Sequence, residues 1–259
     1  MKLEYIIALR YIITKRTLKF VSLISLISVV GLTIGVAALV VVLSVFNGFG
    51  SLVTSILVSF DPHLRIEQPT RSEATAYSVL ENTLQANPNI AAFSPFVQGK
   101  ALMVAKSTNR VVMIRGLLEN KVNSVSGLQQ SIVLGKLKFE NARGNGIVLG
   151  LALADRMGAV VGDTLSIVSP SGAEMAATQL GLPLIRRVVV EGIYESNNKD
   201  YDSFFAFVSL KMAQSLFSVD GFIDGLDVRV RHADDAEKMA LRLKEQFNSF
   251  RIQTWYDLH

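Results

Sequence analysis

The stretch FVSLISLISVVGLTIGVAALVVVLSVF, residues 20–46, is almost wholly apolar, and no charged residue or histidine follows it before Asp61. A bilayer core about 30 Å thick needs roughly 20 such residues in a helix. Leu, Ile, Val and Phe fill about 18 of its positions, and at ~0.4 kcal/mol each they favour insertion by roughly 7 kcal/mol before the polar residues are subtracted. A secretory signal has an apolar region of only about 7–15 residues, followed by a cleavage site. The sequence therefore predicts an uncleaved transmembrane helix over residues 20–46.

The charges beside this helix predict its orientation. Basic residues outnumber the single acid Glu4 ahead of it: Lys2, Arg10, Lys15, Arg16 and Lys19. Lys and Arg beside a membrane-spanning segment stay in the cytoplasm. We therefore expect a cytoplasmic N-terminus and export of everything after the helix. In a Gram-negative cell this places the helix in the inner membrane and the main domain in the periplasm.

Composition narrows the class of protein. The chain has 259 residues, 50% of them hydrophobic, a mean hydropathy of +0.37 and a net charge of +4. The roughly 200 exported residues suffice for one large domain or two small ones. Part of the net charge belongs to the N-terminal cluster, so nothing indicates nucleic-acid binding. The absence of cysteine excludes disulfides, thiolate catalysis and cysteine zinc sites.

Two amphipathic segments flank the transmembrane helix. Residues 1–19 combine apolar and basic positions and predict a helix in the cytoplasmic interface, unless they simply extend the anchor. Beyond Asn47, apolar residues from Leu52 to Phe60 recur at helical spacing opposite Ser and Thr. We expect residues 47–61 to form a periplasmic stalk helix that continues the anchor and ends at Asp61-Pro62.

Small residues share one face of the predicted transmembrane helix. They are spaced three or four apart and include a G-x-x-x-G pair: Ser25, Ser28, Gly31, Gly35 and Ala38. Such faces let another helix approach closely. The pattern predicts packing against membrane helices from other subunits or from a part of the protein that is absent from this sequence.

The exported part begins and ends with similar patterns. In residues 62–98 a strand around Leu64 and Ile66 precedes a helix and a second strand, and Thr70-x-x-Glu73 predicts a capping box for that helix. In residues 222–259 a strand precedes a helix, which Asp234 is expected to cap, and a closing strand. Two β-α-β units from the two ends predict one α+β subdomain.

The intervening residues 99–221 predict a β-rich subdomain. The candidate strands are residues 100–105, 110–115, 146–149, 163–168, 187–193 and 203–208, and short helices are expected near 151–157 and 210–217.

An enzymatic function has little support in the sequence. The three histidines are scattered and form no ligand or triad spacing: His63, His232 and His259. No phosphate-binding loop of the Gly-x-x-x-x-Gly-Lys-[Ser/Thr] type occurs, so we expect no ATPase activity by that route. No catalytic residue, metal site or bound cofactor is predicted.

Residues 169–186 form an unusually long connection between two predicted strands. Connections longer than about 12–15 residues are usually functional or disordered. This one combines prolines and apolar residues with a basic root: Pro170, Met175, Leu180, Leu182, Pro183, Leu184, Arg186 and Arg187. An exposed apolar arm is a docking element for a partner protein. The alternatives are a mobile crossover and a loop folded back on the core.

The anchor also carries a family resemblance. It resembles the first membrane helix of lipoprotein-releasing ABC permeases, the LolC/LolE-type members of the FtsX/MacB permease superfamily, in the residues Val30-Gly31-x-x-x-Gly35-Val36-x-Ala38-Leu39-x-x-Val42-Leu43-Ser44-Val45-x-Asn47-Gly48-Phe49 and the preceding Ala8-Leu9-Arg10-Tyr11. Ile147-Val148-Leu149-Gly150 and Gly162-Asp163 look like that family's extracytoplasmic core. The resemblance implies a MacB-like periplasmic domain of two β-α-β units plus a β-rich insertion, and three further membrane helices beyond His259.

The same resemblance implies a function. It indicates a permease subunit that releases lipoproteins from the inner membrane to a periplasmic chaperone, which the arm around Pro183 captures. It implies a separate ATPase subunit, a second permease copy or homologue, and lipoprotein cargo. Val40, Leu43 and Phe46 would line an acyl-chain path. The alternatives are a MacB-like efflux permease, an FtsX-like regulator of cell-wall hydrolases, or a stand-alone anchored binding module.

Overall fold

The structure, a computed structural model, describes residues 4, 6, 7, 10, 19–105, 108–141, 144–169 and 185–258. The chain divides into two compact units, residues 1–54 and 55–259. The predicted interface helix over residues 1–19 therefore lies largely outside the described residues. Arm residues 170–184 also lie outside the described residues.

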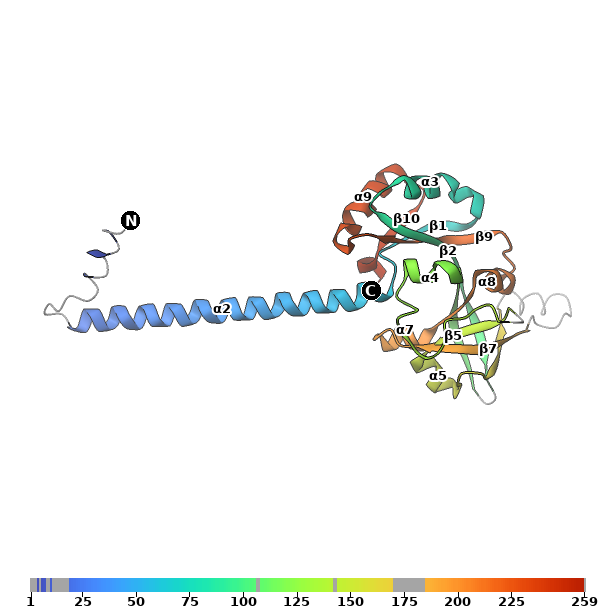
Figure 1. Ribbon diagram of the computed structural model, residues 1–259, viewed down its shortest axis with the longest axis horizontal. Coiled ribbons are helices and arrows are strands. Elements are labelled where there is room, and N and C mark those ends of the chain that lie inside the picture. The colour runs from blue at the N-terminus through green and yellow to red at the C-terminus, as the bar shows by residue number, and fades with distance from the viewer. Residues whose placement is uncertain are drawn as a thin grey trace. The chain divides into compact units, whose positions relative to one another are not determined.

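One long helix, α2 (Lys19–Phe60), contains both the predicted transmembrane helix and the predicted stalk (Figure 1). Its stretch Leu23–Phe49 is long and apolar enough to cross a membrane, and its side chains are exposed. Two hydroxyl groups in this stretch are satisfied within the helix: Ser28 donates to the Ile24 carbonyl at 2.9 Å and Thr33 to the Val29 carbonyl at 2.7 Å. Neither Asn47 nor Gly48 interrupts the helix.

The second unit begins with a sheet built from both ends of that unit. Strand β1 (Leu64–Glu73) lies between β10 (Arg251–Thr254) and β9 (Phe222–Val230), and β9 also pairs with the first half of β2 (Ile90–Val104). All these pairs are antiparallel, so β1 and β2 run parallel with β9 between them. Helices α3 (Ser78–Ala86) and α9 (Ala236–Gln246) lie on one side of this sheet (Figure 1).

The remaining strands close into a barrel that shares β2 with the sheet. The ring runs through β2, β3 (Asn109–Leu117), β8 (Phe205–Ser209), β5 (Gly146–Gly150), β7 (Ile185–Tyr194) and β6 (Thr164–Val168), and β6 returns to β2. Strand β4 (Ile132–Gly135) adds to β7 outside the ring. The division expected at residue 98 therefore falls inside β2, which pairs with β9 up to Phe96 and with β3 from Val97.

Short helices occupy the connections of the barrel. They are α4 (Glu119–Val125), α5 (Leu151–Met157), α7 (Lys199–Phe204) and α8 (Leu210–Phe217). The apolar side chains of strands and helices form one large core, while a second, more aromatic cluster gathers around Phe60 at the end of α2. The α+β fold class expected from the sequence is confirmed.

Three local predictions were wrong. The expected capping box Thr70-x-x-Glu73 lies within β1, because the strand continues with Glu73 paired to Phe222; the 3₁₀ turn η1 (Ala74–Tyr77) separates it from α3. Asp234 lies in another 3₁₀ turn, η2 (Ala233–Asp235), and does not cap α9, which begins at Ala236. The strand expected from residue 203 begins at Phe205, because α7 extends to Phe204.

Close backbone packing at Gly150 generates a test of this fold. A Cβ atom added at Gly150 would overlap the carbonyl oxygen of Asp202, which is backbone and cannot rotate away. We expect Gly150→Ala to destabilise the second unit by about 2 kcal/mol, measured as a lower midpoint of thermal unfolding. The matched control is Gly48→Ala, where the added methyl group meets nothing within 4 Å. Equal midpoints for both variants would contradict the packing of α7 against the start of α5.

Candidate functional site

The last residue of α2 is held by a cluster of aromatic rings. The Phe60 ring stacks on Tyr194 at a centroid distance of 5.4 Å and meets the edge of Tyr201 at 5.3 Å. The Phe60 carbonyl accepts a hydrogen bond from the Gly127 amide at 3.0 Å. Aromatic pairs of this kind contribute about 0.5–1.5 kcal/mol each beyond the area they bury. The end of the helix is thus fixed to β7, α7 and the segment after α4.

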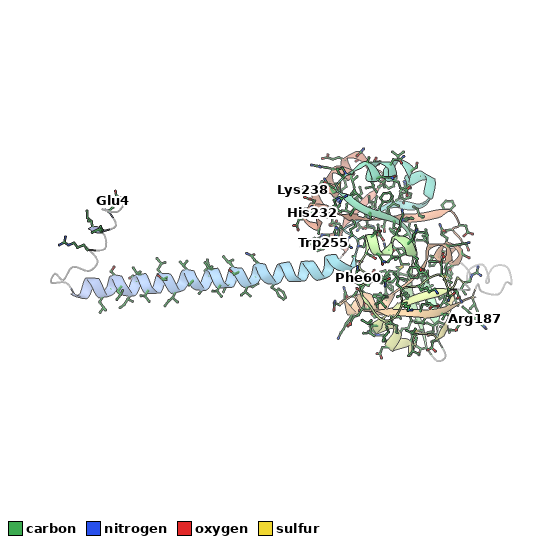
Figure 2. The ribbon with its side chains drawn as sticks, viewed as in Figure 1. Glu4, Phe60, Arg187, His232, Lys238 and Trp255 are labelled. Carbon is green, nitrogen blue, oxygen red and sulfur yellow. The ribbon has the colours of Figure 1, made fainter. Side chains whose placement is uncertain are left out.

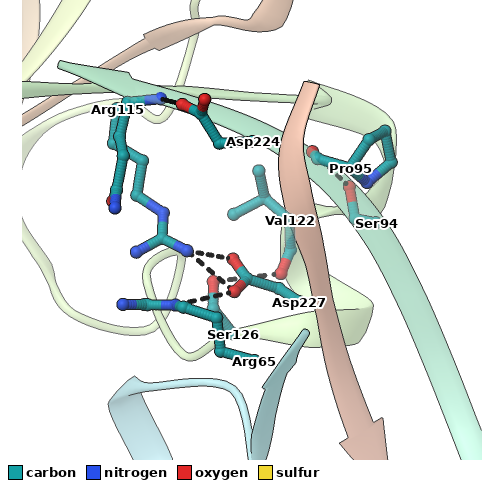
Figure 3. A network of polar contacts seen from close by, with 9 residues as sticks. Arg65, Ser94, Pro95, Arg115, Val122, Ser126, Asp224 and Asp227 are labelled. Carbon is teal, nitrogen blue, oxygen red and sulfur yellow. Dashed lines mark hydrogen bonds and ion pairs between the residues drawn. The ribbon is translucent and has the colours of Figure 1, made fainter. Parts of the chain in front are cut away.

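Next to this cluster, two arginines converge on one aspartate inside the domain (Figure 3). Arg115 Nη2 donates to both carboxylate oxygens of Asp227 at 2.7 and 2.6 Å, and Arg65 Nε donates to one of them at 3.3 Å. The three side chains come from β3, β9 and β1. In the register of the sheet Arg65 lies directly opposite Asp227. Buried charges require such partners, because an unpaired ion in the interior costs several kcal/mol.

The two guanidinium groups also share an aromatic ring. The Arg115 guanidinium carbon lies 4.2 Å and that of Arg65 5.4 Å from the centroid of Phe96 on β2. Although burial acts to lower the pKa of Arg65, the pKa is raised, by Asp227 first and further by Tyr201 and Asp61. Arg65 therefore remains charged, and both guanidinium groups serve a structural role through Asp227. The Arg65–Asp227–Arg115 group is called the charge cluster below.

A cavity of about 470 Å³ opens beside the charge cluster. It is lined by Asp61, Arg65, Asn198, Asp200, Tyr201, Ser203, Phe204 and Phe205. Burial raises the pKa of Tyr194 well above its ordinary value and also raises that of Tyr201, so both phenols stay neutral at physiological pH. The arrangement is suited to holding a helix end in place.

His63 is a buried titratable group two residues after Asp61. Its backbone carbonyl accepts a hydrogen bond from the Trp255 amide at 3.0 Å, and its Nδ1 atom has no hydrogen-bond partner among the described residues. Burial, and then the positive charge of Arg229, lower the pKa of His63 from 6.5 to about 4. The imidazole is therefore neutral at neutral pH.

The root of the predicted arm forms a second candidate site. Arg186 and Arg187 begin β7, and with Lys211 of α8 they line a cavity of about 660 Å³ that also includes Asn145 and the acid Glu140. Arg186 donates to the Ser215 hydroxyl at 2.9 Å. Figure 2 shows Arg187 on the side of the unit away from Phe60. Three exposed cations against one acid make this cavity, called the arm-root groove below, suited to an acidic partner.

The other predicted site residues are placed as follows. The expected helix-packing face, Ser25, Ser28, Gly31, Gly35 and Ala38, and the expected acyl-chain path, Val40, Leu43 and Phe46, lie on α2 with exposed side chains. The remaining arm residues, Pro170, Met175, Leu180, Leu182, Pro183 and Leu184, lie outside the described residues. Among described residues no group of three or more His, Asp or Glu side chains could hold a metal ion.

Sequence reasoning missed the charge cluster and the contribution of α8 to the arm-root groove. Arg65 and Asp227 each stand between two apolar strand residues, a pattern that is typical of a solvent-facing position and gives no signal of a buried ion pair. In the structure both faces of β1 and β9 are covered at this point, so both residues are buried. That they face each other is known only from the register of the sheet.

Comparisons with known proteins agree with this architecture. The family model of the MacB-like periplasmic core domain matches residues 25–246. The chain is 28% identical over 255 residues to "Lipoprotein-releasing system transmembrane protein LolC" of Neisseria meningitidis serogroup B, covering 98% of this chain and 61% of that protein. It is 31% identical over 266 residues to "Lipoprotein-releasing system transmembrane protein LolE" of Haemophilus influenzae, covering 98% and 62%. The chain thus spans about three fifths of the length of these relatives.

A solved structure shows the same fold. The periplasmic region of MacB from Actinobacillus actinomycetemcomitans superposes with a TM-score of 0.51 at 15% identity, covering 79% of this chain and 95% of that one.

The lowered pKa of His63 predicts a pH-dependent stability. His63 binds a proton near pH 6.5 in the unfolded chain and only near pH 4 in the folded chain. Its contribution to the free energy of unfolding is therefore complete above pH 6.5 and is lost as the pH falls towards 4. In His63→Gln the loss of unfolding free energy between pH 7 and 4 should be smaller by on the order of 2 kcal/mol. Denaturant titrations at both pH values measure it. Exposed His232→Gln is the control, and an unchanged pH dependence in His63→Gln refutes the assignment.

Proposed function

The chain belongs to the family of MacB-like periplasmic core domains, and we propose on this basis that it is the N-terminal part of a lipoprotein-releasing permease subunit. The observation that carries the proposal is the similarity to LolC and LolE proteins across 98% of the chain, including both α2 and the folded unit. The likeness to the MacB structure concerns the fold alone.

The proposed topology places α2 in the inner membrane. The basic residues before the helix favour a cytoplasmic N-terminus, and the second unit is then periplasmic. Because the side chains of Leu23–Phe49 are exposed, lipid or other membrane helices must cover them. The proposed partners are a second permease copy or homologue against the small-residue face, and acyl chains against Val40, Leu43 and Phe46.

In this proposal the chain acts by binding its partners and by changing conformation. The sequence has no phosphate-binding loop, so ATP hydrolysis is assigned to a separate ATPase subunit. The cargo is a lipoprotein. The arm and the arm-root groove receive the periplasmic chaperone: the apolar residues around Pro183 provide contact area, and Arg186, Arg187 and Lys211 attract acidic side chains. Complementary charge of this kind mainly accelerates association and aligns the partners.

Charge reversal tests the docking role of the groove. We expect Arg186→Glu with Arg187→Glu to weaken chaperone binding by at least tenfold, and the binding of the unaltered chain to weaken as salt increases. Surface-captured full chain and purified chaperone provide the measurement. The matched control is Arg156→Glu, an exposed arginine on α5.

Deletion of residues 172–184 tests the arm itself. We expect this variant to lose chaperone capture in a pull-down while it still inserts into the membrane. If both the deletion and the double charge reversal bind the chaperone as the unaltered chain does, the docking assignment is wrong.

A further inference from the structure

The charge cluster alone is not electrically balanced. Arg65 and Arg115 carry two positive charges, while Asp227 carries one negative charge between them. The second buried carboxylate in this region is Asp61, which lines the same cavity as Arg65 and interacts electrostatically with it. Exposed fractions are 2% for Arg115, 4% for Asp227, 5% for Asp61 and 9% for Arg65. Half-buried Glu67 adds a weaker attraction on Arg65.

The balancing carboxylate belongs to the residue that directly follows α2. Phe60 ends the helix, and its ring and carbonyl are fixed by Tyr194, Tyr201 and Gly127. The position of Asp61 is therefore set by the last turn of α2. A displacement of that turn moves the Asp61 carboxylate relative to Arg65, because a single peptide unit joins Asp61 to the helix end whereas Arg65 is held in β1.

The charge cluster lies where the sheet meets the barrel. Phe96, under both guanidinium groups, is the last β2 residue paired with β9, and Val97 is the first paired with β3. Arg65 and Asp227 belong to the sheet, whereas Arg115 belongs to the barrel. The ion pairs thus join the two parts of the unit at their shared strand.

We propose that Asp61 is an electrostatic latch: it neutralises the charge cluster while the end of α2 is in place, and its withdrawal loosens the junction between sheet and barrel. This rests on the proposed function and adds to it that the end of α2 moves during lipoprotein release. The neighbouring 470 Å³ cavity gives the withdrawn carboxylate a polar space, so withdrawal requires no repacking of the apolar core. The remaining Arg65 and Arg115 then share one carboxylate, which weakens the hold of β1 on its neighbours.

Charge balance makes the latch testable in the full chain. We expect Asp61→Asn to accelerate amide hydrogen exchange around Arg65 and Asp227 by at least tenfold. Adding Arg65→Gln to Asp61→Asn leaves one cation, Arg115, and one anion, Asp227, so the charges balance again. Exchange should then return to within about threefold of the unaltered chain. The control is Asp200→Asn, which lines the same cavity outside the charge cluster. Unchanged exchange in Asp61→Asn, or faster exchange in the double variant than in the single one, overturns the latch.

The assembled permease tests the consequence for transport. With the ATPase subunit, Asp61→Asn should keep ATP hydrolysis within about twofold while lipoprotein release falls by at least tenfold, and the double variant should recover part of the release. Accelerated exchange with undiminished release overturns the role of the latch in coupling. If the unaltered complex releases no lipoprotein, the proposed function fails, and the exchange measurements still decide whether the latch exists.

Discussion

A buried charge needs an oppositely charged partner inside the fold, and this requirement fixes the strand register in the second unit of the chain. Arg65 and Asp227 lie directly opposite each other in the register of β1 and β9. A slip of one residue would place Leu64 or Ile66 opposite the carboxylate and leave a guanidinium without its partner. Losing one member of a buried pair costs about 3–5 kcal/mol. The ion pairs therefore select one register for the strand that joins the two ends of the second unit.

The same region also fixes the end of the long helix. Phe60 is packed by rings from β7 and α7, and Tyr194 is further tied to β8 by a hydrogen bond from its hydroxyl to the Phe205 carbonyl at 3.3 Å. Continuous backbone hydrogen bonding joins Phe60 to the rest of α2. The last residue of α2 is thus held within the second unit by ring packing, and a buried carboxylate, Asp61, follows it directly.

The sequence was sufficient for features that depend on composition or local period. The long apolar helix, which could cross a membrane, follows from an uninterrupted apolar run. The two β-α-β units follow from alternation and helical spacing around Leu80 and Leu243. Capping was predicted poorly, because Thr70 and Glu73 satisfy a local pattern while pairing with β9 keeps the chain extended. The charge cluster could not be predicted, since its members lie far apart in sequence and meet only when the register is known. The grouping of Lys211 with Arg186 in the arm-root groove could not be predicted either, since these residues also lie apart in sequence.

The arm root and the helix end are connected by a single strand. β7 begins with Ile185, Arg186 and Arg187 in the arm-root groove and ends with Tyr194 on the ring of Phe60. At about 3.3 Å per residue it spans roughly 30 Å. Hydrogen bonds to β5, β6 and β4 along its length resist bending. The stacked rings of Phe60 and Tyr194, and then the continuous backbone of β7, thus link the end of α2 to the arm-root groove.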